Sequence, residues 1–277
     1  MESFVKYDKL TRDQKMNRKE LINFSLTTGK YSEFTDQIIS MAQKKEPAMV
    51  CVANVHMYIE AHKDRSFMQV VNDADVVTPD GTPLTWAMRI LYGIRQERVA
   101  GMDLLPDLLN VMSQQKIGAY FYGGSEAILS RTREYLAKSY PDLVIAGFHS
   151  PPFFSTEDIN NGNVDGEVVT AINYSVPSIV FVVLGCPKQE KWMAAMRGKI
   201  NTVMIGIGGA LPVMIGMKKR APKWMQKYGL EWFFRLVQEP RRLFRRYSIT
   251  NGLFIWIVLK EYFKIKILRP LGFSKAH

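Results

Sequence analysis

Residues 178–197 read SIVFVVLGCPKQEKWMAAMR and contain one predicted strand, turn and helix. The run from Ser178 to Leu184 lacks polar alternation, which is typical of a strand buried on both faces of a parallel sheet. A polar turn begins at Gly185, and the residues from Lys188 to Arg197 predict a helix behind the proline. A buried strand that leads directly into a helix is the building unit of an α/β fold.

The same unit recurs through the first 215 residues. Further apolar runs predict strands, and amphipathic stretches between them predict helices. The predicted strands are Ala48 to Ala53, Ala74 to Thr78, Gly118 to Tyr122, Leu143 to Gly147 and Thr202 to Ile207, and the predicted helices are Asp103 to Gln115 and Ser125 to Ser139. We expect the segment from Leu21 to Lys45 to add an edge strand and one helix. The fold class is therefore α/β, with a mainly parallel, Rossmann-like sheet and flanking helices.

Charge divides the chain near Gly216. Residues 216–277 carry 15 Lys and Arg against 3 Asp and Glu, a net charge of +12, whereas the whole chain carries +11. We therefore expect two parts, a near-neutral α/β body (residues 1–215) and a basic helical appendage (residues 216–277). Strongly basic segments bind phosphate-rich partners such as nucleic acids or anionic lipid headgroups.

The appendage has the pattern of an interfacial helix. Arginines alternate with aromatic and aliphatic residues from Glu231 to Tyr247, and Pro240 is expected to break or restart the helix there. From Ser248 to Leu268 lysines are spaced through an apolar sequence, as in helices that lie in a membrane surface. No apolar run reaches the roughly 18 residues of a membrane-spanning helix. The alternatives are a basic helix packed on the body and helices that pair between two copies, as a homo-oligomer.

Turns that follow the predicted strands are polar or rich in glycine, and ligands of parallel sheets bind at such turns. Asp80 lies in a Pro-Asp-Gly turn, where it either stabilises the turn or takes a proton from a substrate hydroxyl. Gly123 and Gly124 precede a helix start, which either holds a phosphate or is simply capped by Ser125.

A second glycine turn contains Gly206, Gly208 and Gly209. It resembles half of a dinucleotide-binding fingerprint, but Leu211 stands where the third glycine belongs and no acidic residue follows about 20 positions later. We therefore expect no NAD and no other cofactor, but a close approach of the backbone to a diphosphate.

Metal binding is not predicted. Asp73 and Asp75 match the Asp-x-Asp pattern of many metal-dependent nucleotide-sugar transferases, but they precede their apolar strand instead of following it. We interpret them as a helix-to-strand turn and keep a metal-dependent transferase as an alternative. The four His and two Cys residues show no zinc-site spacing.

At these turns the sequence resembles the WecG/TagA/CpsF glycosyltransferase family. The matching stretches are TPDG (78–81), ERVAGMD (97–103), FYGG (121–124), LGCPKQEKW (184–192), IGIGG (205–209), KRAPKWMQ (219–226), GLEW (229–232) and QEPRR (238–242). The resemblance covers about residues 48–247 and implies a Rossmann-like, GT-E-like fold.

The resemblance also implies an activity. It implies an inverting, metal-independent transferase that moves a sugar from a nucleotide diphosphate, such as UDP-N-acetylmannosamine or UDP-glucose, to a polyprenyl-diphosphate-linked sugar. It implies a peripheral protein at the cytoplasmic face of the bacterial inner membrane, which acts in surface polysaccharide synthesis. A non-enzymatic protein that binds nucleic acid or an anionic surface through the basic tail is the second alternative; we expect no nucleic-acid partner.

The resemblance gives Asp80 the role of the base that deprotonates the acceptor hydroxyl. Together with the glycine turns, it gives the expected substrate-binding residues, which are Asn54, Arg98, Gly123, Gly124, Gln189, Gly208, Gly209, Arg235, Arg242 and Arg245. The three appendage arginines match residues that close over the active site. The family often has Thr two positions before the residue matched by Asn54, whereas this chain has Val52.

Overall fold

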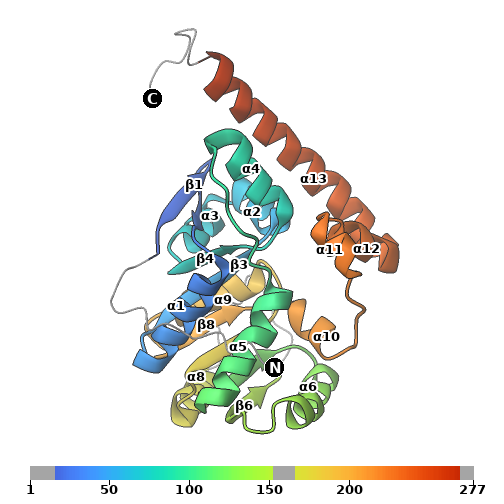
Figure 1. Cartoon of the computed structure of the whole chain (residues 1–277). Helices are drawn as coiled ribbons and strands as arrows, with labels where there is room; N and C mark the ends of the chain where they lie inside the picture. The colour runs from blue at the N-terminus through green and yellow to red at the C-terminus, as the bar shows by residue number, and fades with distance from the viewer. Residues whose placement is uncertain (1–15, 152–165, 269–277) are drawn as a thin grey trace, which may run out of the picture.

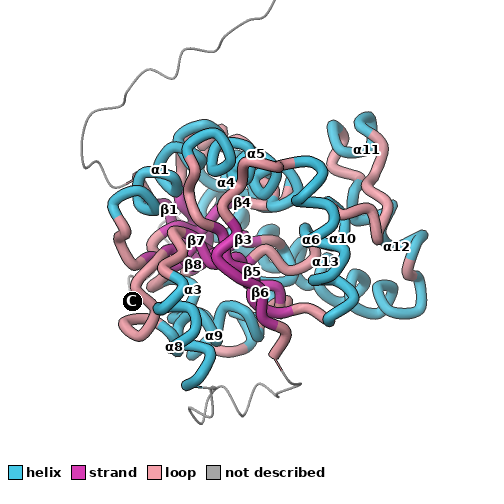
Figure 2. The backbone as a smooth tube through the Cα atoms, turned by 90° about the horizontal axis from the view of Figure 1, so that it is seen from below, coloured by secondary structure: helices cyan, strands magenta, loops and turns pink. Residues whose placement is uncertain are grey.

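The computed structural model describes residues 16–151 and 166–268, and it is a three-layer α/β sandwich (Figures 1 and 2). Its six described central strands are all parallel and lie in the order β4-β3-β8-β7-β5-β6. They are β3 (Ala48–Ala53), β4 (Val76–Pro79), β5 (Ala119–Gly123), β6 (Ile145–His149), β7 (Ile179–Val183) and β8 (Val203–Gly206). The predicted fold class and all six predicted strands are confirmed, with ends that differ by no more than two residues.

Helices cover both faces of this sheet (Figure 2). The body helices are α1 (Tyr31–Lys44), α2 (Val55–Lys63), α3 (Arg65–Asn72), α4 (Thr82–Tyr92), α5 (Gly101–Gln115), α6 (Glu126–Ser139), α8 (Gly166–Ser175), α9 (Lys188–Met196) and α10 (Ala210–Met214). The predicted helices correspond to α5, α6 and α9, and Ser125 caps α6 as its sequence position suggests.

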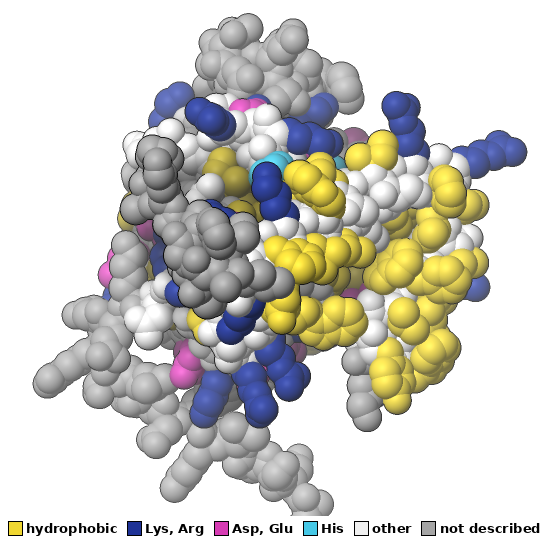
Figure 3. Space-filling model, turned by 90° about the horizontal axis from the view of Figure 1, so that it is seen from above, with side chains coloured by type: hydrophobic (Ala, Val, Ile, Leu, Met, Phe, Trp, Pro, Cys, Tyr) yellow, Lys and Arg dark blue, Asp and Glu magenta, His cyan; other side chains and the backbone are white. Residues whose placement is uncertain are grey.

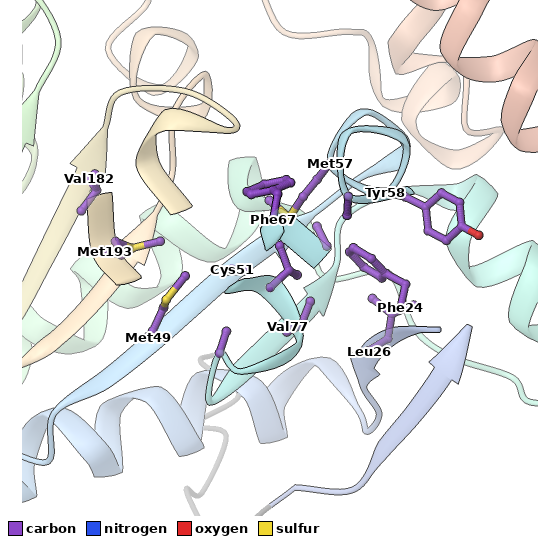
Figure 4. Packing of buried hydrophobic residues seen from close by; sticks show 14 of the residues in the cluster. Phe24, Leu26, Met49, Cys51, Met57, Tyr58, Phe67, Val77, Val182 and Met193 are labelled. Carbon is purple, nitrogen blue, oxygen red and sulfur yellow. The ribbon is translucent and has the colours of Figure 1, made fainter. Parts of the chain in front are cut away.

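The continuous apolar strands are explained by two hydrophobic clusters, one on each face. In β3, Val50 and Val52 pack with α1 and α5, whereas Met49 and Cys51 face the opposite cluster with α2, α3 and α9. Figure 4 shows Met49 and Cys51 among the buried side chains of that second cluster. A strand buried on both faces needs apolar residues at every position, which removes the polar alternation.

The expectation of an N-terminal edge strand is wrong. The chain instead forms an antiparallel hairpin of β1 (Arg18–Leu21) and β2 (Phe24–Thr27), separate from the main sheet. Ile22 and Asn23 both adopt positive φ, and this turn folds the segment back on itself. The hairpin lies beside β4, where the Thr27 hydroxyl accepts a hydrogen bond of 2.9 Å from the backbone nitrogen of Val77.

The C-terminal segment contains α11 (Lys223–Lys227), α12 (Glu231–Gln238), α13 (Pro240–Phe263) and the short π-helix η1 (Lys264–Leu268). The predicted break at Pro240 is confirmed, because α12 ends at Gln238 and α13 begins at the proline. In Figure 1 the long helix α13 crosses the top of the body near α4. Among the described residues, none of the helices combines the length and the apolar composition that crossing a bilayer requires.

Candidate active site

A cleft of about 380 Å³ lies where β3, β4, β7 and β8 end, between the body and helices α12 and α13. It therefore occupies the carboxyl edge of the sheet, where ligands of open α/β folds bind. Seven of the predicted site residues line it: Asn54, Asp80, Arg98, Gln189, Gly208, Gly209 and, from the appendage, Arg235.

Asp80 follows β4 directly and is fixed by its backbone, whose nitrogen donates a 2.7 Å hydrogen bond to the carbonyl of Ala53. Its side chain reaches the cleft, but the surrounding protein shields the carboxyl group from most of the solvent. This burial raises the pKa of Asp80 to about 7, while Arg235 and then Arg98 oppose the rise. Asp80 is thus a carboxyl group that gains or loses its proton near neutral pH, which suits a general base.

Arg98 connects the body to the appendage. Its guanidinium forms ion pairs with Glu231 at the start of α12 and, at 3.2 Å, with Asp103 of α5. Arg220 pairs with the other oxygen of Asp103. Arg235 lies above the glycine turn, with its Nη2 atom 3.8 Å from the Met102 sulfur. The guanidinium groups of Arg98 and Arg235 therefore line one side of the cleft, and ion pairs hold Arg98 in place there.

Gln189 is held at both ends of its amide beneath the glycine turn. Its Oε1 accepts a 3.1 Å hydrogen bond from the nitrogen of Gly185, and its Nε2 donates at 2.7 Å to Glu190. A Cβ atom at Gly206 would come within 2.7 Å of this Nε2, and one at Gly208 within 3.0 Å of Oε1. These glycines are needed because the Gln189 side chain fills the space beside them.

Glu190 itself is fully buried on the side of the sheet that holds Cys51. Burial raises its pKa to about 7, against the opposing effect of hydrogen bonds from Gln189 and Cys186. Glu190 lies in the first turn of α9 among polar residues, and nothing in that sequence indicates its burial.

Asn54 acts as the N-cap of α2, because its Oδ1 accepts hydrogen bonds from the nitrogens of His56 at 3.0 Å and Met57 at 3.2 Å. The cap fixes the side chain at the cleft wall, and the capping role was not anticipated.

The remaining predicted residues do not line the cleft. Gly123 ends β5 and Gly124 follows it, further along the same edge of the sheet, and a Cβ at Gly123 would meet the Val183 backbone at 2.9 Å. Arg245 is exposed on α13, and the Arg242 side chain lies outside the described residues.

The Asp-x-Asp pair lies at the opposite edge of the sheet. Asp75 precedes β4, and its Oδ2 accepts hydrogen bonds from the Met49 nitrogen at 2.9 Å and from Arg197 at 2.7 Å. Asp73 ends helix α3 as its C-cap. The interpretation of this pair as a helix-to-strand turn is confirmed.

Several cleft residues were missed because they belong to the appendage or to the first turns of α2 and α4. They are His56, Thr82, Lys218, Glu231, Trp232, Tyr247, Thr250 and Asn251. A signal for three of them was available, because Tyr247, Thr250 and Asn251 share the helical stripe that continues with Phe254 and Ile257.

The sequence model of the Glycosyl transferase WecG/TagA/CpsF family matches residues 19–267, so the chain belongs to this family of glycosyltransferases. It is 30% identical over 259 residues to a protein of Bacillus subtilis (strain 168), covering 92% of this chain and 96% of the relative. It is 29% identical over 250 residues to one of Bacillus spizizenii (89% and 92%), and 28% identical over 225 residues to one of Staphylococcus aureus strain MW2 (81% and 84%). All three are named N-acetylglucosaminyldiphosphoundecaprenol N-acetyl-beta-D-mannosaminyltransferase.

Proposed function

We propose that this protein transfers a sugar from a nucleotide diphosphate to a sugar linked to a polyprenyl diphosphate, with inversion at the anomeric carbon. The names of its relatives support N-acetylglucosaminyl-diphosphoundecaprenol as the acceptor and N-acetylmannosamine as the transferred sugar. UDP-N-acetylmannosamine is therefore the first donor to test, and UDP-glucose the second. The product would be a lipid-linked disaccharide for a bacterial surface polysaccharide.

The observation that carries this proposal is the carboxyl of Asp80 at the cleft, with a pKa raised by burial to about 7. In the proposed reaction Asp80 takes the proton of the acceptor hydroxyl while that oxygen forms a bond to the anomeric carbon. The bond from this carbon to the diphosphate oxygen breaks, and the nucleotide diphosphate leaves with the electron pair. One displacement inverts the configuration.

Charge on the departing diphosphate would be offset by Arg98 and Arg235, with the backbone of the turn at Gly208 and Gly209 allowing close approach. Guanidinium groups can perform this task without a metal ion. The Asp73 and Asp75 pair is at the other edge of the sheet, so its position gives the metal-dependent alternative no support.

We place the protein at the cytoplasmic face of the inner membrane. The surface of the appendage is the evidence for attachment to a membrane. Helices α11 to α13 expose many large apolar side chains, and Figure 3 shows hydrophobic side chains gathered on the upper face with Lys and Arg nearby. The exposed set includes Trp224, Tyr228, Phe233, Val237, Phe244, Ile255, Trp256, Leu259 and Phe263. Apolar groups with neighbouring cations suit an anionic bilayer surface. Co-sedimentation with anionic but not neutral vesicles would test this attachment.

A donor screen tests the activity. The purified chain is incubated with several nucleotide sugars and a short-chain polyprenyl-diphosphate N-acetylglucosamine in EDTA, and release of nucleoside diphosphate is followed. We expect acceptor-dependent release from one UDP-sugar, unchanged by EDTA. Release that requires added Mg²⁺ or Mn²⁺ would favour the metal-dependent alternative, and no release from any donor would contradict the proposal.

A further inference from the structure

One stripe of helix α13 changes its chemistry along its length. Tyr247, Thr250, Asn251, Phe254 and Ile257 are three or four residues apart and therefore share one face of the helix. Phe254 and Ile257 are buried in the core cluster, and the Phe254 ring lies 5.1 Å from that of Tyr58 in α2. The three residues before them are polar or amphipathic and line the cleft. The stripe becomes polar where the helix passes over the cleft.

This polar part of α13 belongs to the Asp80 end of the cleft. Helix α13 packs on α2 and α4, which begin directly after β3 and β4. Asp80 and Thr82 lie at the end of β4, whereas the glycine turns follow β8 and β7, which are two and three strands away from β4 in the sheet order. The cleft thus has one end formed by backbone turns and another formed by side chains of α13.

The side chains at the Asp80 end suit a saccharide. The rings of Trp232 and Tyr247 are 6.1 Å apart in an edge-on arrangement and offer apolar surface to the C–H face of a sugar. Asn251 also lines the cleft, and its side-chain amide makes no hydrogen bond within the described part of the chain. An amide provides both a donor and an acceptor, which hydroxyl and acetamido groups require.

We propose that Trp232, Tyr247 and Asn251 form the binding site for the acceptor saccharide, with the Asn251 amide hydrogen-bonded to the sugar. This inference rests on the proposed function, since it names the site for the acceptor of that reaction. The acceptor sugar must bring its hydroxyl to Asp80, and α13 packs on the helices that begin directly after β3 and β4. Its lipid would leave along the exposed apolar side of α13, where Ile255 and Trp256 are 58% and 57% exposed.

The test compares Asn251→Ala with Ser248→Ala, a substitution of an exposed residue on the same helix. The probes are a short-chain polyprenyl-diphosphate N-acetylglucosamine and UDP-N-acetylmannosamine. We expect Asn251→Ala to weaken binding of the acceptor probe about tenfold, measured by titration without donor, and to raise its KM similarly. Donor KM and the thermal midpoint should remain those of wild type, and Ser248→Ala should change none of these values.

The outcomes separate the two proposals. If wild type transfers sugar but Asn251→Ala binds the acceptor probe normally, the saccharide site is wrong and the proposed function stands. An equal rise in donor and acceptor KM would also overturn the site, because it would indicate a general distortion of the cleft. If wild type neither binds the probe nor transfers sugar, both proposals fail.

Discussion

Asp80 is the residue on which the proposed chemistry depends. Asp80→Asn keeps the size of the side chain but removes the base, so kcat should fall by about 10²- to 10⁴-fold. Donor affinity and the thermal midpoint should stay close to wild type, because the backbone hydrogen bond to Ala53 is retained. Steady-state kinetics with calorimetric donor binding checks both points. A variant that keeps more than about a tenth of wild-type kcat would make Asp80 a turn residue only.

The pH dependence of kcat/KM follows from the same group. Asp80 acts only when ionised, so activity should rise as pH increases through about 7 and then level off. Arg235 lowers the pKa of Asp80, and Arg235→Gln should therefore move the rising limb to higher pH as well as reduce activity. Arg241→Gln is the matched control, since Arg241 is exposed on α13 and does not line the cleft. Profiles that shift equally in both variants would argue against a specific effect on Asp80.

Glu190 should affect stability more than it affects proton transfer. Its pKa is about 7 in the folded protein and about 4.5 when exposed, so the folded state binds more protons between these values and loses stability as pH rises. From pH 5.5 to 8.5 this group should cost on the order of 2 kcal/mol. Glu190→Gln should remove that part of the loss, as measured by urea unfolding at both pH values. An unchanged pH dependence would show that Glu190 is ionised throughout.

Residues in the turns after strands could be predicted from the sequence, because the strand itself places them at the edge of the sheet. Asp80 is of this kind, whereas Asn54 and Gln189 were expected from the family resemblance. Glu231 could not be predicted as the partner of Arg98, because 133 residues separate them and the pairing depends on how the appendage folds back. Asn251 was missed although it shares the helical stripe of Phe254 and Ile257, because the stripe alone does not show where α13 meets the cleft.

Helix α13 is part of the folded core and also forms a wall of the cleft. Phe254→Ala should lower the free energy of unfolding by about 3–5 kcal/mol, because it leaves a cavity beside Tyr58. Trp256→Ala, on the exposed side of the same helix, should cost less than about 1 kcal/mol. Chemical denaturation of the two variants checks the difference. Equal losses would mean that α13 does not pack on α2 in solution.

Strands of the sheet were predictable because burial on both faces leaves continuous apolar runs, as in β3 and β7. The hairpin of β1 and β2 was not, since its turn places Ile22 at positive φ, where a β-branched residue is unusual. The break between α12 and α13 was predictable because proline cannot continue a helix interior.

The whole molecule combines a Rossmann-like body with an appendage that completes the cleft. The body supplies Asp80 and the glycine turns, whereas α12 and α13 supply Arg235 and the cleft wall opposite them. Charge and composition indicated the division near Gly216 and left open whether the appendage packs on the body, which it does through Phe254 and Ile257.

The anomeric configuration of the product is the most direct test of the proposed single displacement on a lipid-linked acceptor. The chain is incubated in EDTA with α-configured UDP-N-acetylmannosamine and a short-chain polyprenyl-diphosphate N-acetylglucosamine, and the new linkage is determined by NMR. We expect a β-linked disaccharide that is still attached to the lipid diphosphate. An α-linked product, or no disaccharide while the free nucleotide sugar is hydrolysed, would contradict it.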